Sequence, residues 1–303
     1  MQKPFKGDTA ISKEMRGIAI TLAAMLLFAL MDAVSKYLST RYPTPQILWL
    51  RYLFTLPLLL VVLPPRRFSR SLPSRRPWLQ CCRALLLATE IGLVIWAFGR
   101  LPLADVHAVL ALTPLVVTGL SMPLLGERVS PRQWAAVAAG FSGVLIVLRP
   151  GLDVVQSSTL VVLVAVLLYA LYQVLTRLVG RVDGAETSLL WQTAIGSIVL
   201  GGVAAFFWQT PALEHWPLFI LTAVLGGAGH FLLIRALQMA PVAVTQPFTY
   251  TLLLWAVITG YLLFGDLPDQ WTVIGSAIVI AAGSYSALQD RQSRHPPQSE
   301  HVS

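Results

Sequence analysis

Ionisable side chains lie inside long apolar segments of this chain, near the ends of three of them. Asp32 and Lys36 are four residues apart, so a helix would carry both on one face. Arg51 and His107 fall at a similar depth in two further apolar segments. A charged group within a bilayer costs on the order of 3 kcal/mol or more, so such residues face a cavity or a partner. The four residues predict a polar cluster that acts as an ion-paired gate or contacts a substrate. The alternative is that Lys36 extends to the lipid headgroups and Asp32 pairs locally.

Glu90 lies near the middle of its apolar segment, far from either end. It is a candidate proton carrier, or a partner for a cationic group of a substrate. The alternative is a protonated carboxyl that is hydrogen-bonded to a neighbouring helix. His107 and His230 are the histidines within apolar segments, and each is either a group that titrates near neutral pH or a packing residue.

Aromatic and amide side chains recur at helical spacing in two other segments, Tyr169, Tyr172 and Gln173 in one and Gln246, Thr249 and Tyr250 in the other. A pocket with aromatic walls and a few polar groups suits a planar or aromatic metabolite. Tyrosine is also common where helices pack and at headgroup depth, so packing is the competing interpretation.

Several kinds of chemistry have no support in the residue pattern. The two cysteines, Cys81 and Cys82, are adjacent, and neighbours do not form an ordinary disulfide easily. No CxxC, HExxH, GxSxG or GxxxxGK[ST] motif is present, and no spacing of His, Cys, Asp and Glu suggests a metal site. We therefore expect no catalytic residues, no metal and no cofactor, and the basic residues form no face that would bind nucleic acid.

The composition indicates that lipid is the solvent. Of 303 residues, 56% are hydrophobic and only 12% are charged, with a mean hydropathy of +0.69, whereas soluble domains are about 25% charged. A membrane-spanning helix needs about 20 apolar residues. Ten runs of this kind are predicted as helices: 17–39, 46–63, 79–99, 103–125, 132–148, 158–178, 187–208, 216–236, 243–264 and 271–288.

The lysines and arginines are distributed unevenly between the two sides that these ten spans define. If both termini are cytoplasmic, only Arg41, Arg100 and Arg149 lie in outer segments, and Lys36, Arg51 and Arg83 lie within spans. All other basic residues, including those of 64–78, are then on the inner side, where anionic lipid attracts them. We expect a multi-pass protein of the cell (inner) membrane with both termini in the cytoplasm.

The two halves of the chain resemble each other at an offset near 140 residues. The run that begins at Phe28 matches the run that begins at Tyr169, and Leu101-Pro-Leu-Ala matches Ala240-Pro-Val-Ala. Leu124-Leu-Gly-Glu likewise matches Leu263-Phe-Gly-Asp. Because each copy has five helices, an odd number, the second copy inserts upside down. Inverted repeats are typical of secondary transporters, which bind substrate near the midplane where the repeats meet.

The repeat predicts counterparts for the outer polar cluster on the inner side. Asp32 corresponds to Gln173, Lys36 to Arg177, Arg51 to Gln192 and His107 to Gln246. We expect the outer set to form an ion-paired gate and the inner set a weaker, hydrogen-bonded one. Pro114 and Pro247 lie in the two related helices and are candidate hinges. Gly140, Gly143, Gly275 and Gly283 fit either peripheral helix packing or a dimer surface.

Ordered motifs along nearly the whole chain resemble the EamA-type ten-helix members of the drug/metabolite transporter superfamily. They are Phe28-Ala-Leu-Met-Asp-Ala-Val-Ser-Lys36, Leu101-Pro-Leu-Ala-Asp105, Pro123-Leu-Leu-Gly-Glu127, Leu253-Leu-Trp-Ala256, the run from Gly260 to Asp269 and Ala282-Gly-Ser-Tyr285. The resemblance implies a central cavity lined by the first four helices of each repeat, with the fifth helices peripheral. It also implies amino acids, nucleosides, vitamins or similar metabolites as cargo.

We therefore expect an all-α polytopic membrane protein whose ten transmembrane helices form two inverted five-helix EamA-type repeats. The predicted segments are a cytoplasmic tail (1–16), a first repeat (17–150), a second repeat (151–288) and a cytoplasmic tail (289–303). The expected function is secondary-active transport of a small polar metabolite by alternating access, with a channel, a membrane-embedded enzyme and a sensor as alternatives. The sequence leaves room for proton coupling and for a homodimer, and membrane lipid is an expected partner.

Overall fold

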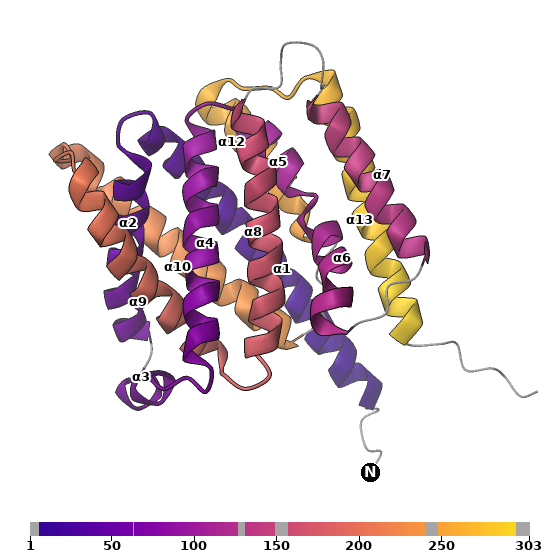
Figure 1. The fold of residues 1–303 in the computed structure, drawn as a ribbon, viewed down its shortest axis with the longest axis horizontal. Helices are drawn as coiled ribbons and strands as arrows, with labels where there is room; N and C mark the ends of the chain where they lie inside the picture. The colour runs from indigo at the N-terminus through magenta and orange to yellow at the C-terminus, as the bar shows by residue number, and fades with distance from the viewer. Residues whose placement is uncertain (1–5, 63, 127–130, 149–156, 240–247, 295–303) are drawn as a thin grey trace, which may run out of the picture.

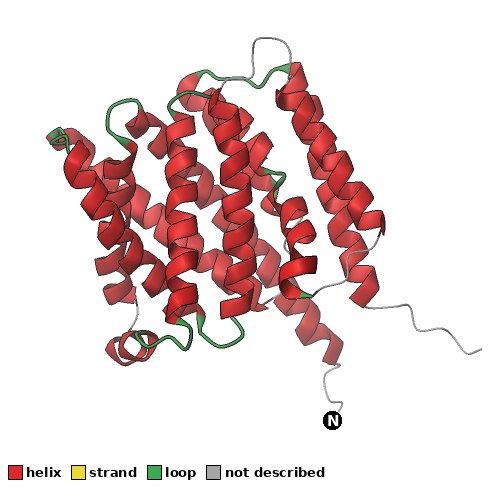
Figure 2. Ribbon diagram, viewed as in Figure 1, coloured by secondary structure: helices red, strands yellow, loops and turns green. Residues whose placement is uncertain are grey.

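The computed structural model describes residues 6–62, 64–126, 131–148, 157–239 and 248–294, and all the regular structure in these ranges is helical (Figure 2). The helices form one bundle, and α1 begins at the same edge of the bundle as that at which α13 ends (Figure 1). We call this edge the inner side and the opposite edge the outer side.

The helices follow one another along the chain as α1 (Lys6–Ser39), α2 (Thr44–Val62), α3 (Pro65–Ser71), α4 (Pro77–Phe98), α5 (Leu103–Leu110), α6 (Thr113–Leu125), α7 (Pro131–Leu148), α8 (Ser157–Val179), α9 (Ala185–Ala204), α10 (Trp216–Met239), α12 (Thr251–Phe264) and α13 (Gln270–Arg294). Two 3₁₀ turns, η1 (Ala205–Phe207) and η2 (Leu213–His215), join α9 to α10.

The predicted all-α membrane fold is confirmed. Among the described residues, six helices are long and apolar enough to cross a membrane, and three shorter apolar helices accompany them, at Leu103–Val117, Trp134–Val147 and Thr251–Phe264. Helices α1 and α13 extend beyond the predicted spans, to Lys6 and Arg294. The short α3 lies in what the sequence suggested was a loop on the inner side.

The fourth predicted span, 103–125, was expected as one helix and is broken into α5 and α6. Pro114 has no N–H to donate to the carbonyl of Leu110, so the α-helical ladder stops before it. The chain closes a tighter turn there, in which the Leu112 amide donates to the carbonyl of Val109 at 3.0 Å. The helix then restarts at Thr113, which places the proline in a first turn, where a missing N–H costs little.

Each main contact made by a helix of the first repeat has a counterpart made by the equivalent helix of the second repeat. Helix α1 packs on α10 and α12, and its counterpart α8 packs on α4 and on α5 and α6. Helix α2 packs on α10 as α9 packs on α4, and α2 also contacts α9 across the seam. In Figure 1, α1 runs from the inner to the outer side, and α8 runs in the opposite direction. The two inverted repeats are thus visible in the packing.

The bundle buries polar groups and exposes apolar ones. Arg83 is 1% exposed and Glu90 6%, whereas Ile198 is 75% and Leu262 72% exposed. In water this distribution would be unfavourable on both counts, because buried charge and exposed apolar surface each cost free energy. With lipid around the outer helix faces, the exposed apolar side chains have the solvent that they require.

Helices α7 and α13 lie side by side at one edge of the bundle (Figure 1) and pack along their length. Gly143 and Gly275 face each other in this contact. A methyl group on Gly143 would come within 2.8 Å of the carbonyl oxygen of Gly275, so only glycine permits this approach. These two glycines therefore serve packing within the chain, the first of the two roles considered for them.

Candidate functional site

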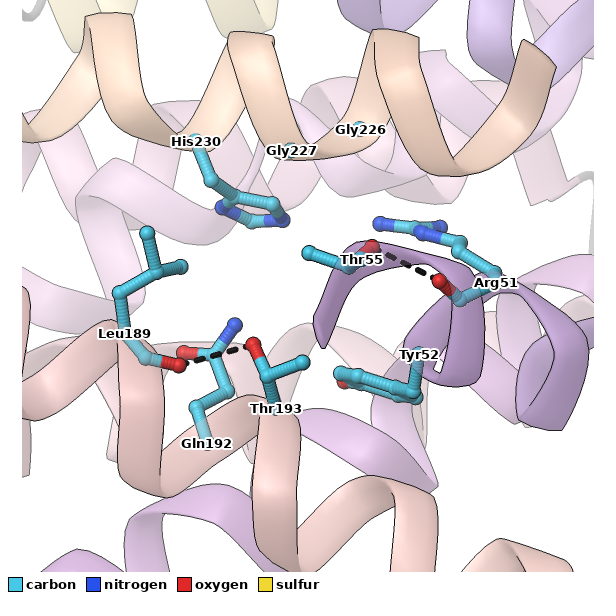
Figure 3. A pocket seen from close by; sticks show the side chains of 9 residues that line it. All are labelled: Arg51, Tyr52, Thr55, Leu189, Gln192, Thr193, Gly226, Gly227 and His230. Carbon is cyan, nitrogen blue, oxygen red and sulfur yellow. Dashed lines mark hydrogen bonds between the residues drawn. The ribbon is translucent and has the colours of Figure 1, made fainter. Parts of the chain in front are cut away.

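A cavity opens where the two repeats meet, between α2, α9 and α10 (Figure 3). It is lined by Arg51, Tyr52, Thr55, Leu189, Gln192, Thr193, Gly226, Gly227 and His230. The space between these walls is narrow, with room for about one water molecule in this conformation. One helix of the first repeat and two of the second thus form a small polar chamber.

Two adjacent residues of α2 bring unpaired polar groups to this cavity. Arg51 and Tyr52 are each 5% exposed. One terminal nitrogen of Arg51 and the hydroxyl of Tyr52 have no hydrogen-bond partner among the described residues. The neighbouring Thr55 and Thr193 differ, because their hydroxyls donate to carbonyls one turn back on their own helices, at 2.7 and 2.8 Å. Buried unpaired donors are unusual, and they mark a place where a ligand could bind.

Both of these side chains are held against glycines of the other repeat. A methyl group on Gly226 of α10 would lie 3.0 Å from Nε of Arg51, and one on Gly196 of α9 would lie 3.1 Å from the Tyr52 ring. The sequence favours close approach at these positions because α9 and α10 carry glycine where α2 crosses them. The packing fixes the direction of both side chains before any ligand arrives.

Acidic and aromatic groups surround the cavity from α1, α4 and α8. The Glu90 carboxyl is within electrostatic range of Asp32 and Arg51. Tyr169 in turn interacts with Glu90 and stacks on Tyr172, with ring centroids 5.8 Å apart. His230 interacts with Arg51 and contacts the ring of Phe28 edge-on at 4.9 Å. The charge of Glu90, Asp32 or Arg51 therefore affects the other titratable groups around the cavity.

Arg83 of α4 is the centre of a dense network on the inner side of the cavity. Its guanidinium donates to Gln80 at 3.2 Å and to the carbonyl of Ser188. Through one terminal nitrogen it also reaches Tyr172 at 3.2 Å, Thr176 at 3.3 Å and Gln192 at 3.4 Å. Tyr172 donates to the same Gln192 oxygen at 3.0 Å. Gln192 therefore belongs both to this network and to the cavity wall.

The network continues into an inner cap, which we define as Ser74, Arg75, Gln80, Asp183 and Ser188. Asp183, at the tip between α8 and α9, accepts hydrogen bonds from the Ser74 hydroxyl, from the Arg75 amide at 2.9 Å and from Gln80 at 2.9 Å. Burial acts to raise the pKa of this carboxyl, but the three hydrogen bonds together hold the pKa below its usual range. The carboxylate is thus kept ionised at neutral pH and ties the tip between α8 and α9 to the start of α4 and the segment before it.

An outer cap lies at the opposite edge, formed by Tyr42, Gln46, Gln209, Ala212 and His215. The Tyr42 hydroxyl is 2.7 Å from Nδ1 of His215 and accepts the Ala212 amide at 3.0 Å. Gln46 donates to the carbonyl of Gln209 at 2.7 Å and accepts its amide at 2.9 Å. Segment 208–215 is thereby pinned to the start of α2.

The predicted outer polar cluster is divided in the structure. Lys36 pairs with Asp266 at 2.5 Å and donates to the carbonyl of Leu101 at 3.3 Å. Asp32 instead lies 3.2 Å from Nε2 of His107, although the alignment is too poor for a hydrogen bond. Arg51 is in the cavity, apart from these pairs. The lysine of the predicted cluster therefore pairs outside it, with Asp266 on the loop after α12, and the gate stays a prediction.

Other predicted site residues have mixed placements. Gln192 and His230 line the cavity beside Arg51, and Tyr169 lies near Glu90. Tyr250 packs its hydroxyl against Gly283 of α13 instead. Gln173 is half-buried on α8, as is Arg177. Gln246 and the hinge candidate Pro247 lie outside the described residues.

Sequence reasoning missed Tyr52 of the cavity wall and three residues of the inner side, Gln80, Arg83 and Asp183. Of the predicted inner set, Gln192 belongs to the hydrogen-bond network of the inner side, which also holds a buried arginine and an ionised aspartate that the prediction lacked; the expectation of a weaker inner gate stays a prediction. A signal existed for Arg83, which is a basic residue within a predicted span. Asp183 lies in a loop, where an acidic residue is ordinary.

Comparison with known proteins identifies the family. The EamA-like transporter family matches residues 15–149 and, a second time, residues 156–285. This chain belongs to the EamA-like transporter family. The riboflavin transporter of Rhizobium johnstonii is 26% identical to this EamA-like transporter over 94% of this chain and 95% of the relative. The S-adenosylmethionine uptake transporter of Rickettsia prowazekii is 26% identical, over 96% and 100%.

Two more distant similarities extend the comparison. The pseudopaline exporter CntI of Pseudomonas aeruginosa is 22% identical over 88% of this EamA-like transporter and 94% of the relative. A solved structure described only as "Crystal structure of protein" superposes with a TM-score of 0.66 at 16% identity, over 91% of this chain and 98% of that one. That structure supports the fold alone. The EamA-like transporter is thus a multi-pass membrane protein that transports small metabolites.

Proposed function

We propose that this protein binds its cargo in the cavity between α2, α9 and α10 and moves it by alternating access, as a secondary-active transporter. The single observation that carries this proposal is the position of the cavity. It lies at the seam of two inverted repeats, between an outer and an inner cap, and Arg51 and Tyr52 bring unpaired buried groups to it. Binding at such a seam is the general arrangement in transporters built from inverted repeats.

Alternation follows from the correspondence of the two repeats. At the offset of 141 residues that relates Asp32 to Gln173, Tyr42 corresponds to Asp183. Each of these residues docks on the segment that precedes the third long helix of the other repeat. If one cap opens while the other stays closed, the cavity is accessible from one side only. When the two caps exchange these states, access to the cavity changes to the other side.

The inner side is proposed to face the cytoplasm of a cell whose inner membrane holds the protein. Helix α3 carries Arg66, Arg67 and Arg70 there, Arg75 follows α3 in the chain, and Arg181 lies in the loop between α8 and α9. Such residues attract anionic lipid of the cytoplasmic leaflet. The exposed apolar faces contact lipid, and those of α7 and α13, which include Phe141 and Val273, offer a surface for a homodimer.

Glu90 is the group that we propose for proton coupling. It is 6% exposed and makes no ion pair within the described residues, yet it interacts with Arg51 in the cavity wall. A carboxyl in this position can carry a proton while Arg51 holds the cargo. Replacement by Gln keeps the shape and removes the titration, so Glu90→Gln should transport without a response to a pH gradient. A full response in this variant would exclude the role.

The function is tested by cross-linking the caps in liposomes. In a background with Cys81→Ser and Cys82→Ser, one variant carries Tyr42→Cys with Ala212→Cys, and the other carries Ser74→Cys with Asp183→Cys. Exchange of labelled riboflavin, S-adenosylmethionine and amino acids across the bilayer is measured before and after oxidation. Either disulfide should stop exchange, and reduction should restore it. Exchange that continues with a cap locked would contradict alternating access.

A further inference from the structure

We propose that the cargo carries a carboxylate and that Arg51 and Tyr52 bind it in the cavity. This inference rests on the proposed function, because it names the chemical class of the group that the same cavity receives. The argument depends on the charge of Arg51, on the geometry of the donors around it and on the absence of a second free cation in the described part of the cavity wall.

Arg51 lacks the partner that its burial requires. Within the described residues, no carboxylate lies at ion-pair distance from it, whereas Lys36 has Asp266 at 2.5 Å. Glu90 interacts with Arg51 only from a greater distance and is shared with Asp32. A buried arginine can be compensated by hydrogen bonds to neutral acceptors, as Arg83 is, or by a counter-ion. Arg51 has no side-chain hydrogen bond and no ion pair among the described residues, and an anion is the group that would compensate its charge best.

Two buried donors without partners line the same cavity. Arg51 and Tyr52 are consecutive residues of α2 that leave it in different directions, Arg51 against Gly226 of α10 and Tyr52 against Gly196 of α9, and a carboxylate has two oxygens that could accept one bond from each side. Figure 3 shows the amide nitrogen of Gln192 turned toward the same space. Its oxygen is already engaged by Tyr172 and Arg83, so the nitrogen is the end that remains for a ligand.

A doubly charged group such as a phosphate monoester fits less well. Arg83, the other buried arginine beside the cavity, already donates from all three of its nitrogens to neutral acceptors of the protein. Arg51 is thus left as the one guanidinium with an unpaired nitrogen in the described cavity wall. A single free cation matches a single negative charge, which favours a carboxylate over a phosphate dianion.

The test uses matched pairs of probes that differ only in charge. Nicotinate is compared with nicotinamide, L-tryptophan with L-tryptophanamide, and benzoate with benzamide and phenyl phosphate. Binding is measured as thermal stabilisation of the purified protein, and exchange is measured in liposomes. The variants are Arg51→Gln, Arg51→Lys and the control Arg100→Gln, whose exposed side chain stacks on Trp96 away from the cavity.

The acid of at least one pair should bind about tenfold or more tightly than its amide, because a charge-assisted hydrogen bond is worth more than a neutral one. Arg51→Gln should abolish this preference, Arg51→Lys should retain part of it and Arg100→Gln should leave it intact. The inference is overturned if amides bind as well as acids, if phenyl phosphate binds better than benzoate or if Arg51→Gln keeps the preference.

Two further readouts separate this inference from the proposed function. If neutral compounds exchange and Arg51→Gln exchanges them equally, the transport proposal is supported and carboxylate recognition is contradicted. If acids bind through Arg51 but nothing exchanges, carboxylate recognition is supported and the transport proposal is contradicted. Without any probe, Arg51→Gln should melt no lower than the wild type, since it removes an uncompensated buried charge. A lower melting temperature would make Arg51 a structural residue and overturn the inference.

Discussion

Tyr42 of the outer cap lies between the first two helices of the first repeat, and Asp183 of the inner cap lies between the first two helices of the second repeat. The contacts that they make are alike in position and differ in chemistry. Tyr42 uses a neutral hydroxyl toward His215 and the Ala212 amide, whereas Asp183 uses a carboxylate toward three donors. Hydrogen bonds to an ionised acceptor are roughly twice as strong as neutral ones. The two repeats thus make this contact at corresponding positions, but the hydrogen bonds of the inner cap are stronger than those of the outer cap.

A second difference reinforces the first. The inner cap is continuous with the buried network of Arg83, which reaches the cavity through Gln192. At the outer side, the ion pair of Lys36 and Asp266 lies apart from Tyr42, and Asp266 is one-third exposed. Exposure lowers the value of an ion pair. We therefore expect the empty protein to favour the state in which the inner side is closed.

The largest effect is expected for Arg83→Met, which removes the centre of the inner network. Buried acceptors left without donors cost about 1–3 kcal/mol each, and the loss of a buried charge offsets part of that cost. The free energy of unfolding should fall by about 3 kcal/mol, measured by thermal denaturation in detergent. Arg100→Gln is the control. A melting temperature equal to that of Arg51→Gln would show that the two buried arginines have the same role.

Asp183→Asn should weaken the inner cap itself. The new amide turns a donor toward the three donors that now bind the carboxylate, a cost of about 1–3 kcal/mol. With Thr193→Cys in the cavity and Cys81 and Cys82 replaced by Ser, an impermeant thiol reagent added at the inner side should react about tenfold faster. Faster reaction from the outer side alone would reverse the assignment of the caps.

Tyr42→Phe should loosen the outer cap by a smaller amount. The substitution removes the hydroxyl and keeps the ring contacts with His215 and Phe219. Loss of these neutral hydrogen bonds should cost about 1 kcal/mol, so the same reporter cysteine should react faster from the outer side, by less than in Asp183→Asn. An effect as large as that of Asp183→Asn would remove the proposed asymmetry.

The smallest effect is expected at the outer ion pair. A double-mutant cycle with Lys36→Met and Asp266→Asn should give a coupling free energy below about 1 kcal/mol, because Asp266 is partly exposed. The coupling, measured through thermal stability, should decrease further in high salt. A coupling well above this value that resists salt would place the main outer gate at this pair instead of at Tyr42.

The sequence predicts the fold well because apolar runs long enough for a bilayer become helices in the described residues, and because the two halves share ordered motifs. The fourth run is the exception, since its break into α5 and α6 was not predicted, although Pro114 was a signal for it. The candidate site is harder to predict from the sequence. Lys36 pairs with Asp266, 230 positions away, and spacing on one helix cannot reveal such a partner. A charged residue in a span indicates a need for compensation, but the fold decides what supplies it, as the opposite environments of Arg51 and Arg83 illustrate.

Gly143 and Gly275 face each other with backbone against backbone where the last helices of the two halves cross. No side chain stands between them that could change rotamer to take up a displacement. This pair of helices therefore behaves as a fixed brace that ties the ends of the two halves together. If the first four helices of each half rock past one another during a transport cycle, they do so about this brace, and the break between α5 and α6 beside it is where the chain can bend.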